Sequence, residues 1–382
     1  MAKLGLPVPP GFTISTEVCT YYYSHGQTYP RELKKQVDAA VAKVERLRGQ
    51  RFGDPKNPLF FSVRSGARVS MPGMMDTVLN LGINERITRA LAENTNNPRF
   101  AWNSYWRFIF MFGDVVMGAE KEELSEVLET YKKRHGYKLD TELSAEDWQE
   151  VAERTKTKIK HLTGKQVPED PETQLWQAIG AVFLSWNNPR AITYRKLNKI
   201  PDDWGTAVNV QSMVFGNMGE DSGSGVGFTR SPATGEKKLY GEFLQNAQGE
   251  DVVAGIHTPK SIDELKTLFP QCYAELLRIS EILEKYFRDM QDIEFTIERG
   301  KLWMLQTRTG KRTAAAAVKI AMDMVKEGLI SRKEAILRID PKSIESFFRP
   351  SFDPKAKKDV LAKGLAASPG AAVGEVVFDP NE

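Results

Sequence analysis

The pattern of apolar and polar positions changes along the chain, and it predicts both helices and strands. Residues 13–49 and 172–198 carry apolar side chains at helical spacing. Residues 59–64 (LFFSVR) form a short apolar run that is typical of a buried strand. Pro189 is expected to end or kink the second helical segment, because proline cannot continue the helical hydrogen-bond ladder.

The middle and the C-terminal half alternate between these two patterns. Residues 84–167 are rich in charge and helical in period, which predicts a helical insertion. Residues 205–310 contain alternating runs that predict a β-rich lobe. A helix is expected from Ala314 to about Lys326, and Ser331 with Glu334 forms a capping box for the helix after it. The predicted fold class is α+β.

These changes in pattern give the expected domain boundaries. They are an N-terminal lobe at 1–83 that continues at 168–204, the helical insertion at 84–167, the β-rich lobe at 205–311, a helical linker at 312–361 and the first strand of a truncated further domain at 362–382. The chain enters an apolar, proline-rich segment directly after Met1, so we also expect residues to be missing upstream.

Composition narrows the classes of partner. The 382 residues carry 53 Lys and Arg against 50 Asp and Glu, and this balance does not favour nucleic acid. No apolar run is long enough to span a bilayer, so a membrane partner is not expected. Cys19 and Cys272 lie far apart without metal-ligand spacing, which indicates reduced thiols and a cytoplasmic location.

The segment SVRSGARVSMPGMMDT, residues 62–77, is the strongest candidate for anion binding. Arg64 and Arg68 supply guanidinium groups suited to oxyanions, and Gly66 and Gly73 allow a close approach of the backbone to a ligand. A polyphosphate would need these features. A surface loop with two solvated arginines explains the same residues equally well.

A hairpin within residues 292–308 is the second candidate. A two-residue loop would place Glu294 opposite Leu305, whereas a three-residue loop at 299–301 pairs Glu294 with Gln306 and Asp292 with Arg308. We expect the three-residue loop, with Leu302, Met304, Gln306 and Arg308 on one face. A carboxylate and an amide oxygen would then suit Mg²⁺ beside a guanidinium. Taken alone, an ordinary surface hairpin is the favoured alternative.

Other candidates are weaker, and each has a structural alternative. They are a glycine-rich turn near the site (Gly223, Gly225, Gly227), a strand that could meet an adenine edge (Gln211 to Val214, including Met213), an acidic metal face (Glu242, Glu250) and a second phosphate contact (Arg107). An ordinary core strand is the favoured alternative for Gln211 to Val214, and the two carboxylates could simply be solvated. The arginine could extend its charged group to solvent.

With these residues assembled, the chain resembles the N-terminal nucleotide-binding domain of the pyruvate, phosphate dikinase family. The resemblance covers essentially the whole chain. It rests on several long motifs: SVRSGARVSMPGMMDTVLNLG, SWNNPRAITYR, DDWGTAVNVQSMVFGN, GSGVGFTRSPATGE, GEFLQNAQGEDVVAG and DIEFTIERGKLWMLQTRTGKRT.

The resemblance implies an ATP-grasp fold in three subdomains with ATP and Mg²⁺ between two lobes. It also implies roles by position: Arg64 and Arg308 on the transferring phosphates, Glu294 and Gln306 on the metal, Arg107 as a further phosphate contact, Glu242 and Glu250 as acidic positions facing the nucleotide, and Gln211, Met213 and Val214 beside the adenine.

In the family, this domain passes the β,γ-phosphates of ATP to a histidine on a swivelling domain, and pyruvate finally becomes phosphoenolpyruvate. The resemblance implies that this chain lacks an upstream lysine segment, the histidine domain and the pyruvate site, so we expect it to be incomplete for turnover. The family is dimeric through domains absent here, and some eukaryotic members are organellar. The ATP lobe of a phosphoenolpyruvate synthase and a non-catalytic nucleotide-binding remnant stay open as alternatives.

Overall fold

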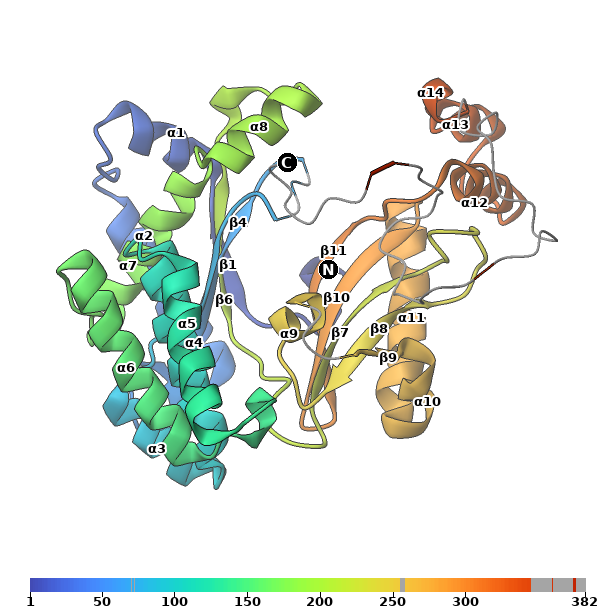
Figure 1. The fold of residues 1–382 in the computed structure, drawn as a ribbon. Coiled ribbons are helices and arrows are strands. Elements are labelled where there is room, and N and C mark those ends of the chain that lie inside the picture. The colour runs from blue at the N-terminus through green and yellow to red at the C-terminus, as the bar shows by residue number, and fades with distance from the viewer. Residues whose placement is uncertain (70, 72, 255–257, 345–358, 360–373, 376–382) are drawn as a thin grey trace. The chain divides into compact units, whose positions relative to one another are not determined.

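The computed structural model describes residues 1–69, 71, 73–254, 258–344, 359 and 374–375. The chain divides into two compact units (Figure 1). The N-terminal unit comprises Val8–Met218, and the C-terminal unit comprises Met1–Pro7 together with Gly219–Glu382. Nearly all of the segment 362–382, predicted to begin a further domain, lies outside the described residues.

The N-terminal unit is built on a four-stranded sheet in the order β1-β6-β4-β5. Its strands are β1 (Gly11–Ile14), β4 (Phe61–Gly66), β5 (Thr77–Leu81) and β6 (Ala207–Ser212), with β2 (Arg51–Phe52) and β3 (Pro58–Leu59) pairing separately. The strand predicted at 59–64 is thereby confirmed. Alternate residues such as Val63, Val208 and Val210 are fully buried, so one face of this sheet forms core.

Helices supply the rest of this unit. They are α1 (Thr16–Ser24), α2 (Leu33–Arg48), α3 (Glu85–Thr95), α4 (Pro98–Val115), α5 (Lys121–His135), α6 (Ala145–Thr163), α7 (Pro171–Ser185) and α8 (Pro189–Asn198). The helical character predicted for 84–167 is confirmed, and so is the break before Pro189. The predicted helix at 13–49 is instead a strand end and two helices. Helix α7 contacts β4, β5 and β6 on the apolar side of the sheet (Figure 1).

The C-terminal unit contains a five-stranded sheet in the order β11-β10-β7-β8-β9. Its strands are β7 (Gly223–Phe228), β8 (Tyr240–Gln245), β9 (Lys260–Ser261), β10 (Gln291–Glu298) and β11 (Lys301–Thr309), and all of the pairings are antiparallel. Ile293, Phe295 and Ile297 are buried, so alternate positions of β10 face the core.

Five helices accompany this sheet: α9 (Gly249–Ala254), α10 (Leu265–Leu268), α11 (Pro270–Phe287), α12 (Ala314–Lys326) and α13 (Arg332–Leu337), followed by the short α14 (Pro341–Ile344). Helix α11 contacts β10 and β11. Both predictions for the C-terminal helices are confirmed: α12 spans 314–326, and the Ser331–Glu334 capping box is formed at the start of α13.

The glycine-rich run is a central strand, so its interpretation as a flexible turn is wrong. Gly223, Gly225 and Gly227 belong to β7, which pairs with both β10 and β8. A Cβ atom on Gly225 would lie 2.4 Å from Phe295 Cζ and 2.8 Å from the carbonyl oxygen of Glu242. Glycine is needed here because the neighbouring side chain and strand approach too closely for any other residue.

Candidate functional site

A row of side chains crosses one face of the sheet in the C-terminal unit. Gln306 of β11 pairs with Glu294 of β10, Glu294 pairs with Val226 of β7, and Val226 pairs with Glu242 of β8. Directly opposed residues share a face, so Gln306, Glu294 and Glu242 lie on the same side of the sheet. Glu242 lies two strands from Glu294, which corresponds to about 10 Å between their Cα atoms. All three side chains are partly exposed.

The hairpin has the predicted pairing of residues, but its loop is shorter than expected. Glu298 pairs with Lys301, so the loop contains only two residues, Arg299 and Gly300. Both have positive φ, 49° and 73°, as a type I′ turn requires. The prediction of a three-residue loop is therefore wrong, whereas the pairing of Glu294 with Gln306 and of Asp292 with Arg308 is confirmed.

A β-bulge reconciles the short loop with this pairing. Phe295 pairs with Met304 while Glu294 pairs with Gln306, so Leu305 is an extra residue on β11. The bulge changes which face of the sheet the residues on either side of it occupy. Met304 shares the buried face with Phe295, whereas Gln306 shares the open face with Glu294. The expectation that Leu302 and Met304 lie on the same face as Gln306 and Arg308 is wrong for this reason. An unpaired residue at mid-strand leaves no signal in the alternation of residue types.

A single guanidinium serves two carboxylates on this face. Arg308 Nη2 lies 2.9 Å from Glu294 Oε1 and 3.3 Å from Asp292 Oδ2. About a quarter of each of these side chains is exposed. Burial raises the pKa of Asp292, the Arg308 charge opposes this shift, and the Glu294 charge adds to it. Asp292 was expected only as the cross-strand partner of Arg308, but its carboxylate also lies in the cluster formed by Arg308 and Glu294.

The chemistry of these donors fits a hard divalent cation held by few protein ligands. Glu294 and Asp292 offer carboxylate oxygens, and Gln306 offers an amide oxygen, which are the ligand types that Mg²⁺ prefers. Among the described residues, no three His, Cys, Asp or Glu side chains form a closed metal cluster. An open site of this type leaves coordination positions for water and phosphate oxygens.

Glu250 lies on a different element from the row. It occupies the first turn of α9, a six-residue helix that contacts β7, β8 and β10, and its side chain is half-buried. The structure therefore keeps Glu250 in the C-terminal unit with Glu242 and Glu294 but not within the cross-strand row.

A comparable polar row crosses the sheet of the N-terminal unit. Arg64 of β4 pairs with Thr77 of β5 and with Asn209 of β6, and Asn209 pairs with Thr13 of β1. The Thr13 hydroxyl donates to Asn209 Oδ1 at 2.7 Å. Arg64 thus lies on a strand and not in a loop. Asn209 was not predicted as a site residue, although its alternation with Val208 and Val210 places it on the polar face.

Gln211, Met213 and Val214 fall at the end of β6. The Gln211 side chain, two residues after Asn209, lies on the polar face and donates to the Pro9 carbonyl oxygen at 3.2 Å. Met213 and Val214 follow the strand and are buried. The Met213 amide donates to the Phe60 carbonyl oxygen at 2.8 Å, so this backbone donor is already used within the unit.

Arg107 lies on the aromatic helix α4 and is held by a residue one turn earlier. Its Nε donates to Asn103 Oδ1 at 2.9 Å, and Asn217 Nδ2 lies 3.5 Å from the same oxygen. Asn103 is buried, so the guanidinium is oriented from beneath. Asn103 was not predicted from the sequence, but the i, i+4 spacing on a helix could have indicated it.

The fold and these side chains define an α+β protein whose two sheets each present a polar face. Comparison with known proteins identifies the family: residues 27–268 and 263–329 match the family model described as "Pyruvate phosphate dikinase, AMP/ATP-binding domain". The chain belongs to this family.

Relatives from distant organisms match the whole chain. It is 58% identical to pyruvate, phosphate dikinase of Rhizobium meliloti, 53% identical to that of Clostridium symbiosum and 54% identical to that of Giardia intestinalis. In each case the match covers 100% of this chain and 43–44% of the relative. The chain therefore spans less than half the length of these relatives. None of the helices among the described residues is long and apolar enough to cross a membrane.

Proposed function

We propose that this chain binds ATP with Mg²⁺ as the nucleotide-binding part of a pyruvate, phosphate dikinase, on an ATP-grasp fold. The family match and the two polar sheet faces support this proposal. The observation that carries it is the pairing of Glu294 with Gln306 beside Arg308, because it joins metal ligands and a phosphate-binding group on one face.

The residues have separate roles in this proposal. Glu294 and Gln306 would hold Mg²⁺, which would offset the negative charge of the phosphates. Arg308 and Arg64 contact the transferring phosphates through their guanidinium groups. The remaining contacts are Arg107 on the phosphates, Gln211, Met213 and Val214 beside the adenine, and Glu242 and Glu250 as acidic groups facing the nucleotide.

The chemistry of the whole enzyme would then begin here. The β,γ-phosphates of ATP pass to a histidine on a separate swivelling domain, and AMP leaves. Inorganic phosphate takes the terminal phosphoryl group as pyrophosphate, and the remaining phosphoryl group converts pyruvate into phosphoenolpyruvate. The residues described here position the donor and offset its charge, which is most of what phosphoryl transfer asks of a protein.

Titration calorimetry on the 382-residue chain tests this proposal. We expect ATP to bind with Mg²⁺ present and to bind more weakly in EDTA. The variant Gln306→Leu should lose the Mg²⁺-dependent part of the affinity, by roughly 10–100-fold if the amide is a ligand. The control Gln245→Leu changes the same residue type on β8, outside the row. Absence of binding at millimolar Mg·ATP, or equal affinities for wild type and Gln306→Leu, would contradict the proposal.

A further inference from the structure

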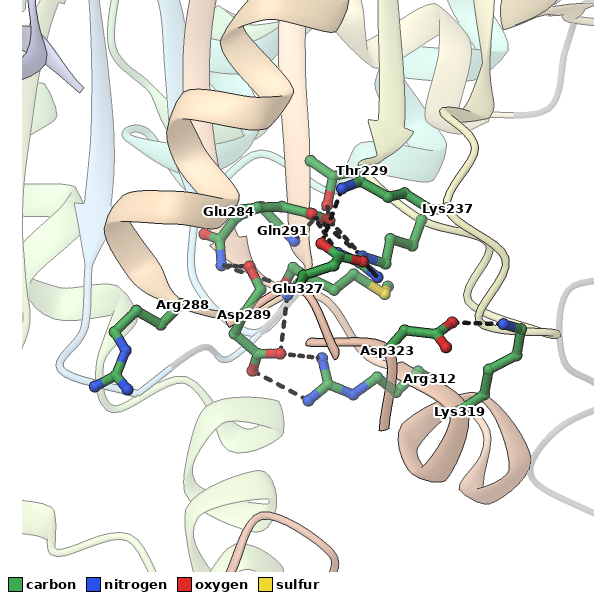
Figure 2. Close-up of polar contacts among 12 residues, drawn as sticks. Thr229, Lys237, Glu284, Arg288, Asp289, Gln291, Arg312, Lys319, Asp323 and Glu327 are labelled. Atoms are coloured by element: carbon green, nitrogen blue, oxygen red, sulfur yellow. Dashed lines mark hydrogen bonds and ion pairs between the residues drawn. The ribbon is translucent and has the colours of Figure 1, made fainter. Parts of the chain in front are cut away.

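The C-terminal unit buries an arginine that the proposed function does not use. Arg230 follows β7, and its side chain is fully buried. Its Nε and Nη2 donate to the Glu284 carboxylate of α11 at 2.9 and 2.8 Å. Its Nη1 and Nη2 donate to the Glu327 carboxylate, directly after α12, at 3.0 and 2.9 Å. Figure 2 shows Glu284 and Glu327 approaching one another from their two elements.

Stability alone does not account for this arrangement. A buried ion pair is costly to desolvate, and apolar residues of similar volume often serve a fold equally well. Helix α12 already has an apolar contact with this region. Its Ile320 and Met324 lie in one buried cluster with Met290, the residue before β10, and Phe228 of β7 packs against the cluster. Two bidentate pairs do something that apolar packing does not: they permit only one relative placement of the elements they join.

The electrostatics agree with a permanently charged cluster. Burial alone would lower the pKa of Arg230, but hydrogen bonds to Glu284 and Glu327 outweigh it and raise the pKa. Burial acts to raise the pKa of Glu327, yet its bonds to Arg230 and Lys237 lower it overall. Arg230 and Glu327 therefore keep their charges at neutral pH.

A chain of hydrogen bonds continues from this cluster to the hairpin. The Thr229 hydroxyl donates to Glu284 Oε1 at 2.7 Å and accepts a hydrogen bond from the backbone N–H of Gln291 at 3.0 Å. The Thr307 hydroxyl donates to Gln291 Oε1 at 3.0 Å. Figure 2 shows Thr229, Gln291 and Glu284 together at this point. Thr307 lies between Gln306 and Arg308 on β11.

We infer that Arg230 is a positioning residue that connects helix α12 to the segment of β11 carrying Gln306 and Arg308. The connection runs through Glu284, Thr229 and Gln291. A displacement of α12 then loosens the strand segment that presents the candidate metal ligand and phosphate contact. The consequence for nucleotide binding rests on the proposed function, whereas the mechanical connection does not.

The two ends of this chain of hydrogen bonds, Glu327 and Thr307, can be altered with little risk to folding. Glu327→Gln removes the charge at the partly exposed end, and Thr307→Val removes only a hydroxyl. Each has a matched control. Asp323→Asn changes an acid on α12 whose ion pairs are with Lys319 and Lys326 of the same helix. Thr309→Val makes the same change two residues along the same strand.

Hydrogen exchange without nucleotide tests the mechanical connection. We expect residues 305–309 of β11 to exchange faster in Glu327→Gln than in wild type, although the substitution lies on another element. Asp323→Asn should leave this segment unchanged. If β11 exchanges at the wild-type rate in Glu327→Gln, the connection is refuted, whatever the chain binds.

Calorimetry with ATP, in Mg²⁺ and in EDTA, tests the consequence. Glu327→Gln and Thr307→Val should each reduce the Mg²⁺-dependent gain in affinity by about tenfold, as loss of a group that orients a metal ligand does. Affinity in EDTA should fall by less, because only the Arg308 contact with phosphate is then weakened, and both controls should match wild type. If both test variants show the same Mg²⁺-dependent gain in ATP affinity as wild type, the positioning role is overturned. A wild-type chain without any Mg²⁺-dependent gain would instead overturn the proposed function.

Discussion

At the scale of single residues, the balance of charge around Arg308 decides what the hairpin can bind. One guanidinium pairs with two carboxylates on a partly exposed face. A cation that takes the carboxylates competes with Arg308 for them, and a phosphate competes with the carboxylates for Arg308. In the proposed function, a metal–phosphate complex would satisfy both sets of groups at once, which would favour Mg·ATP over either component alone.

The pKa of Asp292 predicts a pH dependence. Burial raises this pKa above its ordinary value of 3.8, so the proton is lost at a higher pH than from an exposed aspartate. A protonated Asp292 no longer adds negative charge beside Glu294 and Gln306, so Mg²⁺-dependent ATP affinity should fall as the pH decreases towards the raised pKa. Calorimetry across the acidic range measures this. The profile of Asp292→Asn should lack the Asp292 step, and an unchanged profile would exclude Asp292 from the site.

Arg308→Ala should separate binding from transfer. In the full-length enzyme, we expect loss of histidine phosphorylation by about 10³–10⁵-fold, as for other arginines that stabilise a transferring phosphoryl group. Nucleotide affinity should stay within about tenfold of wild type, since other contacts remain. Arg308→Lys keeps the positive charge but lacks the planar guanidinium that can donate two parallel hydrogen bonds, so it should recover only part of the rate. An alanine variant that phosphorylates at the normal rate would refute the assignment.

At the scale of elements, the positions of the strands were easier to predict than the side of the sheet on which each residue lies. Alternation along residues 292–298 was sufficient to predict β10. The pairing of Glu294 with Gln306 was expected from a three-residue loop, and the structure reaches the same pairing with a two-residue loop and a bulge. The sequence did not reveal the bulge at Leu305, because a bulge is set by how two strands twist and pack together. The glycines of β7 were misinterpreted for a similar reason: the side chain that requires glycine at position 225 is Phe295, which lies 70 residues away in the sequence.

Gly225→Ala should destabilise the C-terminal unit. The added Cβ would meet Phe295 Cζ at 2.4 Å, so the ring or the strand must move, and overpacking of this kind costs about 1–3 kcal/mol. Chemical denaturation measures the loss. Gly249→Ala is the matched control because its Cβ would meet nothing within 4 Å. Restoration of stability in the double variant Gly225→Ala/Phe295→Leu would identify the ring as the cause, and a neutral Gly225→Ala would contradict the packing argument.

At the scale of the whole molecule, the chain consists of two units that follow one plan. Each has a sheet with an apolar face packed as core and a polar face that carries candidate residues. Helices and strands could be predicted from periodicity, and the family from long motifs. Asn103 and Asn209 were not predicted as members of the polar groups, and Asp292 was expected only to pair with Arg308. Spacing and alternation indicate the side on which such residues lie, but their importance depends on neighbours brought together by folding.

The central claim is that Glu294 and Gln306 together hold the metal that accompanies ATP. The most direct test is an experimental structure of this chain with Mg²⁺ and a non-hydrolysable ATP analogue. We predict an ion about 2.0–2.1 Å from a Glu294 carboxylate oxygen and from Gln306 Oε1, with phosphate oxygens and water completing the shell. A metal–nucleotide complex bound with both side chains out of reach of the ion would contradict the account.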